Sequence, residues 1–251
     1  MTGAVLETKG LCKSFGALEV AREIDFALHP GARHALIGPN GAGKTTFINL
    51  IAGVLKPSRG RILLDGEDLA HLSQAQRVKR GIARTFQINT LFAGLSVIEN
   101  IMMAVAEHVG VAGDKFRPAG ANREVIERAQ HVLETLRLQD DALRLVRELP
   151  YGRQRLVEIA IALALEPKVL LLDEPAAGVP SAESHIILDM IDHLPADIAV
   201  MIIEHDMDVV FRFAREITVL VNGAVLASGT PEEIANNEQV RTVYLGGTHH
   251  G

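Results

Sequence analysis

Short apolar runs alternate with segments of helical periodicity along this chain. Residues 169–172 and 198–203 are continuous apolar runs, which are typical of strands that are covered on both faces. Residues 34–37 form a shorter run, and a glycine-rich turn and a segment of helical spacing follow it. A further strand is predicted at 61–64. This alternation predicts an α/β fold with parallel strands.

Two patterns near the end of the chain mark a hairpin and a helix start. Asn222-Gly223 lies between the apolar runs 217–221 and 224–227, and both residues tolerate the positive φ of a tight hairpin turn. Thr230-Pro231-Glu232-Glu233 combines an N-cap threonine, a proline in the first turn and a glutamate at the third position. We therefore expect a C-terminal helical extension at about 230–245.

The middle of the chain has a different pattern. From about residue 89 to 149 the spacing is helical and strand signals vanish, with the apolar residues of 125–136 on one helix face. Residues 110–122 contain three glycines and Pro118, a composition typical of a mobile loop. We interpret about 89–160 as a helical subdomain inserted into the α/β core.

The glycine-rich turn has the full spacing of a P-loop and its required context, after a strand and before a helix. Glycines allow successive backbone N–H groups to point at phosphate oxygens, and the helix start adds partial positive charge. Lys44 supplies a full charge near the β- and γ-phosphates, and the Thr45 hydroxyl ligates Mg²⁺. The alternative is a glycine-rich turn that precedes a helix by chance. The candidate nucleotide-binding residues are Gly38, Pro39, Asn40, Gly41, Ala42, Gly43, Lys44, Thr45 and Thr46.

A second candidate group follows the strand at 169–172. A buried strand that ends in Asp173 places this carboxylate at the edge of the sheet where ligands bind in open α/β folds, and there it can hold Mg²⁺. Glu174 is then suited to polarise the attacking water next to the γ-phosphate. The alternative is an acidic strand end that pairs with a nearby base.

Three more residues are candidates for the nucleotide site only in combination with these two groups. The amide oxygen of Gln87 can reach Mg²⁺ or the water, His205 can hydrogen-bond the γ-phosphate, and Phe15 can stack on adenine. Each also has an ordinary interpretation, as a surface glutamine, a capping histidine and a core phenylalanine.

Composition indicates which kinds of partner the protein can bind and in which compartment it is found. The chain has 25 Lys and Arg against 31 Asp and Glu, a net charge of −6, which argues against nucleic-acid binding. It contains no apolar run of about 18–20 residues that would span a membrane, and its start does not resemble a signal peptide. The single cysteine, Cys12, cannot form an internal disulfide, which fits a reducing compartment. We expect a cytoplasmic protein.

The order of these motifs resembles the ATP-binding subunit of ABC transporters, and the resemblance extends from about residue 6 to 245. The resemblance implies a single ABC ATPase domain over 4–245: a P-loop NTPase core with an antiparallel β subdomain and the inserted helical subdomain. It implies ATP and Mg²⁺ as cofactors, with Thr45, Gln87 and Asp173 as metal ligands. It also implies that Lys44, Glu174 and His205 are catalytic and that Phe15 stacks on adenine.

The subfamily is indicated by local sequences at 84–87, 175–178, 203–207 and 243–246, which resemble the branched-chain amino-acid type. Such proteins power importers of hydrophobic amino acids or related small solutes at the cytoplasmic face of the inner membrane. The implied partners are two permease subunits, a second ATPase subunit (identical or different) and, indirectly, a solute-binding protein. Lipopolysaccharide-export ATPases and a weakly hydrolysing regulatory cassette remain as alternatives.

Two other classes fit less well. ABC-type ATPases of DNA repair insert long coiled coils, and those acting on ribosomes carry two cassettes in one chain, whereas this chain has neither pattern. A P-loop kinase for nucleosides or small molecules would explain Lys44 but neither His205 nor the glycine motif at 149–154.

The segment 149–154 departs from the family's signature, which usually reads Leu-Ser-Gly-Gly-Gln. Gly152 is kept, but Pro150 replaces the serine that touches the partner's γ-phosphate, Tyr151 replaces a glycine and Arg153 a glutamine. The following D-loop has Pro180 where an acidic residue or asparagine is usual. We expect the nucleotide site completed by this signature to be the slower one, with Arg153 restoring part of the lost interaction through its charge.

Overall fold

The strands predicted at 34–37, 169–172 and 198–203 are present in the computed structural model. Every residue of β3 (Arg33–Ile37), β7 (Val169–Asp173) and β8 (Ala199–Ile203) is buried. The structure describes residues 3–85, 91–112 and 122–245, except for the side chains of 181–183 and 244–245. They form two units, one comprising the chain up to Arg77 and from Ala196 onward, the other Val78–Pro195.

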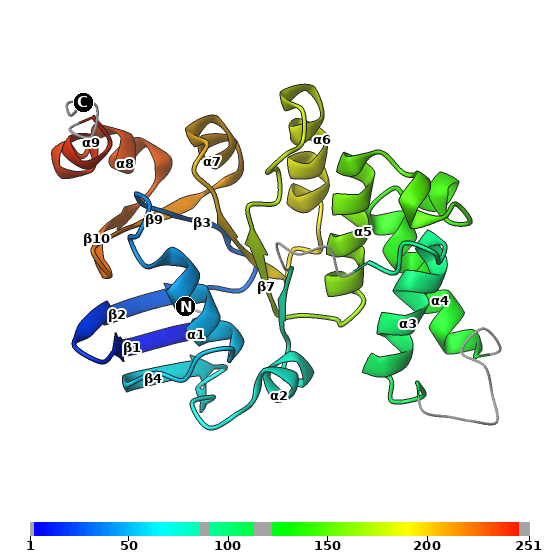
Figure 1. The fold of residues 1–251 in the computed structure, drawn as a ribbon, viewed down its shortest axis with the longest axis horizontal. Helices are drawn as coiled ribbons and strands as arrows, with labels where there is room; N and C mark the ends of the chain where they lie inside the picture. Colours follow the sequence, from blue (N-terminus) through cyan, green and yellow to red (C-terminus); the bar gives the residue numbers. More distant parts are fainter. Residues whose placement is uncertain (1–2, 86–90, 113–121, 246–251) are drawn as a thin grey trace. The chain divides into compact units, whose positions relative to one another are not determined.

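The first unit contains two sheets (Figure 1). One is antiparallel, in the order β2-β1-β4-β5, and consists of β1 (Leu6–Phe15), β2 (Leu18–Leu28), β4 (Arg59–Leu64) and β5 (Glu67–Asp68). The other has the order β10-β9-β3-β8; β3 runs parallel to β8 and β9, and β9 (Glu216–Val221) forms a hairpin with β10 (Ala224–Gly229). The helices of this unit are α1 (Lys44–Ala52), α7 (Met207–Phe213), α8 (Pro231–Asn236) and α9 (Glu238–Leu245).

The expected features of the C-terminal segment are confirmed. The hairpin turns at Asn222 and Gly223, which have φ values of 50° and 81°. Helix α8 begins with a complete capping box, in which Thr230 Oγ1 accepts from the Glu233 amide (3.3 Å) and Glu233 Oε2 accepts from the Thr230 amide (2.8 Å).

The second unit combines one pair of parallel strands, β6 (Ile82–Arg84) and β7, with helices (Figure 1). Helices α3, α4 and α5 pack against one another, and the region from residue 91 to 149 contains no strand in its described parts, as expected. Residues 113–121 of the predicted mobile loop lie outside the described residues. The helices are α3 (Val97–His108), α4 (Arg123–Thr135), α5 (Tyr151–Leu163) and α6 (Ser181–Asp192), with short 3₁₀ turns η2 (Gln139–Asp141) and η3 (Val146–Glu148).

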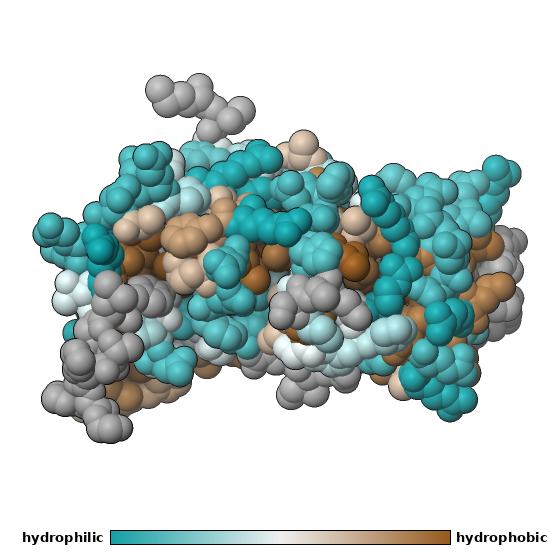
Figure 2. Space-filling view, turned by 90° about the horizontal axis from the view of Figure 1, so that it is seen from above, coloured by the Kyte–Doolittle hydropathy of each residue, from teal (hydrophilic) through white to brown (hydrophobic). Residues whose placement is uncertain are grey.

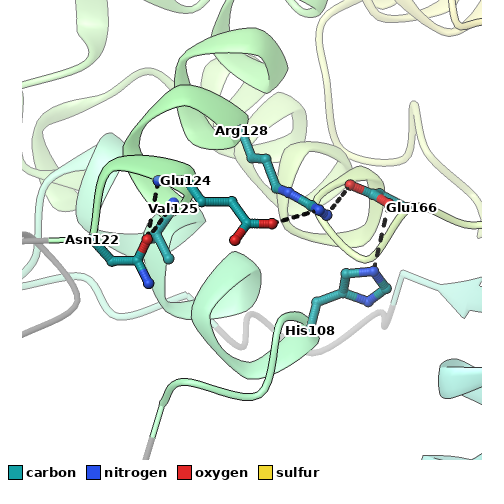
Figure 3. A network of polar contacts seen from close by, with 6 residues as sticks. All are labelled: His108, Asn122, Glu124, Val125, Arg128 and Glu166. Carbon is teal, nitrogen blue, oxygen red and sulfur yellow. Dashed lines mark hydrogen bonds and ion pairs between the residues drawn. The ribbon is translucent and has the colours of Figure 1, made fainter. Parts of the chain in front are cut away.

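A polar network connects three segments of the second unit (Figure 3). Glu166, in the turn between α5 and β7, forms an ion pair with Arg128 of α4 and lies 3.6 Å from Nε2 of His108 at the end of α3. Arg128 also pairs with Glu124 at 2.7 Å, one turn earlier in α4. These groups are partly exposed, and exposed ion pairs contribute about 0–1 kcal/mol each, so helix packing dominates the stability here.

Most of the surface in view is hydrophilic, with smaller hydrophobic areas between the hydrophilic ones (Figure 2). Within the described segments, none of the helices combines the length and the apolar content that crossing a membrane requires.

A buried arginine donates hydrogen bonds to carbonyl groups at the C-terminal end of α1. Arg77, in α2 (Gln74–Lys79), is 1% exposed, and its Nη1 donates to the carbonyl oxygens of Leu50 (2.7 Å) and Ile51 (2.8 Å). Nε donates to the carbonyl of Leu72 at 3.3 Å. Burial lowers the pKa of Arg77, but a guanidinium stays charged. A cation at this end of a helix interacts favourably with the helix dipole.

We expect the substitution Arg77→Met to destabilise the protein by about 2–4 kcal/mol, because helix-end carbonyls lose charged donors inside the core. Urea unfolding followed by circular dichroism measures this. Lys79→Met, an exposed substitution in the same helix, is the matched control and should change the free energy of unfolding by less than about 0.5 kcal/mol. Equal stability of the two variants would contradict the structural role of Arg77.

Candidate active site

The predicted phosphate-binding loop connects β3 to α1. β3 ends at Ile37, and α1 begins at Lys44 with Gly43 as its N-cap residue. The loop of residues 38–43 thus emerges from a buried central strand and leads directly into a helix, which is the context that the motif requires.

Glycine is needed at two points of this loop because other backbone segments approach it closely. A Cβ atom on Gly38 would lie 2.2 Å from the carbonyl oxygen of Leu220, and one on Gly43 would lie 2.7 Å from that of Val20. Gly43 also has a φ of 99°, which side chains disfavour. A side chain at either position would displace the loop.

The start of α1 is electropositive. Gly43 provides no side-chain cap, and the first turn contains no acidic residue. Lys44 Nζ donates to the carbonyl oxygens of Gly38 (2.6 Å) and Pro39 (3.1 Å), so a full positive charge is held against the loop. Helix start and cation together favour a polyphosphate group as the ligand.

His205 leaves the sheet at the same edge as this loop. β8 lies parallel to β3 with Leu36 opposite Ile203, so the residues that follow both strands emerge side by side. The His205 side chain is 69% exposed, with Nδ1 3.9 Å from the carboxylate of Glu204. Asp206, and not His205, caps helix α7, accepting from the amides of Asp208 and Val209. The interpretation of His205 as a capping residue is therefore wrong.

Phe15 ends β1, at the hairpin that leads into β2. It is 50% exposed, and Lys13 Nζ lies 4.9 Å from its ring centroid. Two residues beyond its strand partner Leu18 comes Val20, whose carbonyl approaches Gly43. Phe15 is not a core residue, and in the chain it precedes the segment of β2 that contacts the phosphate-binding loop. Adenine stacking stays a prediction.

Asp173 belongs to the second unit, as the last residue of β7. It is 5% exposed, and Oδ2 accepts from Nη2 of Arg84 at 2.9 Å. Arg84 ends the neighbouring parallel strand β6, and its strand partner is Leu171. The ion pair fixes the orientation of the carboxylate. No local pattern indicated this partner, although the possibility of a nearby base was open.

Glu174 has an unusual backbone conformation directly after Asp173. Its φ is 49°, in the left-handed region, and its carbonyl accepts from the Ala177 amide at 3.1 Å. A non-glycine residue held this way costs about 1–3 kcal/mol, and such residues concentrate at functional sites. Five other described non-glycine residues share this conformation, so the catalytic role of Glu174 stays a prediction.

The predicted signature segment begins α5. Pro150 is its N-cap residue and provides no side-chain hydrogen bond, and Gly152 is buried in the first turn. The ring of Tyr151 packs on Gly178, since a Cβ atom there would lie 3.3 Å from Tyr151 Cε1. The Arg155 guanidinium lies 5.0 Å from the same ring centroid.

Two buried carboxylates accept hydrogen bonds from the arginines Arg153 and Arg155 of α5. Arg155 donates to Glu158 at 2.7 Å, and burial raises the pKa of the Glu158 carboxyl while the arginine opposes the shift. Arg153 donates through Nε to Asp141 at 2.7 Å and through Nη2 to the Arg137 carbonyl at 3.1 Å. The charge of Arg153 is thus neutralised within its own unit, which weakens the expectation that it replaces the lost serine.

The predicted Mg²⁺ ligands are oxygen donors, which Mg²⁺ prefers. Thr45 is exposed in the first turn of α1, and Asp173 offers a buried carboxylate in the second unit. Gln87 lies outside the described residues. The donors present fit this metal chemically, and the Mg²⁺ site stays a prediction.

Comparison with known proteins agrees with this arrangement. A family model described as ABC transporter matches residues 21–177, and one described as branched-chain amino acid ATP-binding cassette transporter matches residues 224–250. The high-affinity branched-chain amino acid transport ATP-binding protein BraF of Pseudomonas aeruginosa is 38% identical, over 98% of this chain and 99% of its own. The lipopolysaccharide export system ATP-binding protein LptB of Haemophilus influenzae is 33% identical, over 97% and 98%.

A solved structure is similar as well. The ADP conformation of MJ1267, an ATP-binding cassette of an ABC transporter, superimposes with a TM-score of 0.86 at 31% identity and covers 98% of this chain and 100% of its own.

Proposed function

This chain belongs to the ABC transporter family of ATPases, and from that premise we propose that it powers the uptake of branched-chain or other hydrophobic amino acids. The observation that carries the choice of solute class is the match of residues 224–250 to the branched-chain amino-acid model. These residues include β10, α8 and α9, a segment outside the general ABC match. The greater identity to BraF than to LptB supports the same choice over lipopolysaccharide export.

In the proposed mechanism the chain's own residues bind and orient the triphosphate. The loop 38–43 and the start of α1 bind the phosphates, Lys44 neutralises their charge and Phe15 stacks on the base. Glu174 polarises the attacking water, and His205 hydrogen-bonds the γ-phosphate. When bound, Mg²⁺ would be held by Thr45, Gln87 and Asp173 and would neutralise charge on the phosphates.

The proposed assembly contains a second ATPase subunit, whose signature glycine closes over the ATP on this chain. Gly152 does the same for the nucleotide on the partner. ATP holds the two subunits together and cleavage releases them, because contacts to the γ-phosphate exist only before hydrolysis. Two permease subunits at the cytoplasmic face of the inner membrane, supplied by a solute-binding protein, complete the proposed importer.

Affinity purification of the tagged chain from detergent-solubilised membranes tests this proposal. We expect mass spectrometry to identify two polytopic permeases and an ATPase subunit that co-purify, with radiolabelled leucine uptake lost when the gene is deleted. Recovery of a lipopolysaccharide-export apparatus would overturn the choice of solute while leaving the ATPase assignment intact.

The departures in the signature predict unequal sites in the assembled transporter. Pro150→Ser restores a hydroxyl at the start of α5, and a hydrogen bond to a charged phosphate contributes about 1.5–3 kcal/mol. We expect ATP hydrolysis by the assembled transporter to increase severalfold, measured as phosphate release.

Pro150→Ala is the matched control, because it removes the proline ring without supplying a hydroxyl. Serine at an N-cap also stabilises a helix by about 1 kcal/mol, so the melting temperatures of both variants are measured alongside. If the serine and alanine variants hydrolyse ATP equally fast, the missing hydroxyl does not limit this site.

A further inference from the structure

The turn between β9 and β10 has contacts that a simple surface hairpin does not need. The Gly223 amide donates to the carbonyl of Ala42, inside the phosphate-binding loop, at 3.0 Å. The Gly223 carbonyl accepts from the Arg22 amide of β2 at 2.8 Å. One turn residue therefore connects the loop to β2, although the three segments are far apart in the sequence.

Close backbone packing accompanies these hydrogen bonds. A Cβ atom on Gly223 would lie 2.6 Å from the Val20 carbonyl oxygen. A Cβ atom on Gly43 would lie 2.7 Å from the same oxygen and 3.4 Å from the Gly223 Cα atom. The turn, β2 and the loop are thus in contact with no room for a side chain between them.

The contact between the turn and the loop borders a surface hollow. A hollow of about 280 Å³ adjoins it, and its lining includes Gly41, Arg22, Asn222 and Gly223. Ala42 and Gly43, the two residues held by the turn and β2, directly precede Lys44.

We propose that the Asn222–Gly223 turn is a positioning element for the phosphate-binding loop, which sets the affinity for ATP without touching it. The inference rests on the proposed binding of ATP at this loop. The turn fixes the Ala42 carbonyl through a hydrogen bond and supports Gly43 through contact, so the amide groups that face the phosphates are oriented before the nucleotide arrives. Preorganisation of this kind increases affinity because less order has to be imposed on binding.

The chain provides a matched control for the test. The β4–β5 turn at Asp65–Gly66 has φ values of 48° and 81°, nearly the same as those of Asn222–Gly223. A Cβ atom on Gly66 meets nothing within 4 Å. Gly66→Ala and Gly223→Ala therefore introduce the same backbone strain, but only Gly223→Ala places a Cβ atom against the β2 backbone and so displaces the turn that is hydrogen-bonded to the loop.

The experiment measures the dissociation constant of a fluorescent ATP analogue and the nucleotide-free melting temperature of the full-length protein and both variants. We expect both variants to melt at lower temperature and only Gly223→Ala to bind the analogue about tenfold more weakly or worse, a difference of about 1.4 kcal/mol. Equal affinity of the two variants would overturn the positioning role while ATP binding by the unmodified protein stands. Failure of the unmodified protein to bind the analogue would overturn both proposals.

A second measurement needs no variant. Hydrogen exchange of the unmodified protein should slow at residues 220–225 when the ATP analogue binds, whereas exchange at 63–68 should stay the same. An equal response of the two turns would contradict the proposal even if Gly223→Ala does not fold.

Discussion

Replacement of Glu174 by glutamine is expected to abolish ATP turnover by the assembled transporter and to leave ATP binding intact. The amide keeps the size and hydrogen-bonding shape of the carboxylate but cannot accept the proton of the attacking water. Loss of a general base usually lowers the rate by about 100-fold or more. Phosphate release measures turnover, and light scattering with ATP measures the trapped dimer of ATPase subunits.

Glu148→Gln provides the control for this prediction, because Glu148 is an exposed carboxylate of the same unit in η3. It should hydrolyse ATP at the normal rate. Normal turnover by Glu174→Gln would show that another group activates the water.

Lys44→Ala is expected to act earlier, on nucleotide binding itself. The ammonium is positioned at the start of α1 by the Gly38 and Pro39 carbonyls, and its removal leaves the phosphates without their fixed positive charge. A hydrogen bond to a charged group contributes about 1.5–3 kcal/mol, so ATP should bind about 10- to 100-fold more weakly. Titration with a fluorescent ATP analogue measures the loss.

Lys56→Ala controls for the general loss of a positive charge, since Lys56 is an exposed lysine of the same unit. Its ATP affinity should be unchanged. If both alanine variants bound ATP equally well, the phosphates would have to lie elsewhere than at this loop.

Sequence patterns predicted the fully buried strands and also β4, β9 and β10, whose burial is mixed. β3, β7 and β8 are buried at every position, so their residues are mostly apolar and their runs are conspicuous. β2 was not predicted from its pattern because its alternation is interrupted: Glu23 has a φ of 45°, and the buried positions Ala21 and Ile24 are three residues apart. β1 shifts register against β2 at three places, and these shifts also interrupt the alternation that predicts a strand.

The residues of the candidate site also differ in how far the sequence could predict them. The phosphate-binding loop was predictable because its geometry demands particular residues at fixed spacing, as at Gly43. The partners Arg84 of Asp173 and Asp141 of Arg153 were not predictable, because both come from elements that only folding brings together. Local motifs therefore identify the groups that perform the chemistry, whereas the groups that orient them depend on tertiary structure.

The buried position of Arg77 has a consequence for natural and laboratory variation. It belongs to no nucleotide-binding motif, yet it joins α2 to the end of the helix that starts at Lys44. In a saturation library scored separately for protein abundance and for transport per molecule, substitutions at position 77 should deplete the protein, while the surviving molecules transport normally. Position 44 should show the reverse, with full abundance and no transport, and the two profiles would distinguish residues selected for folding from residues selected for chemistry.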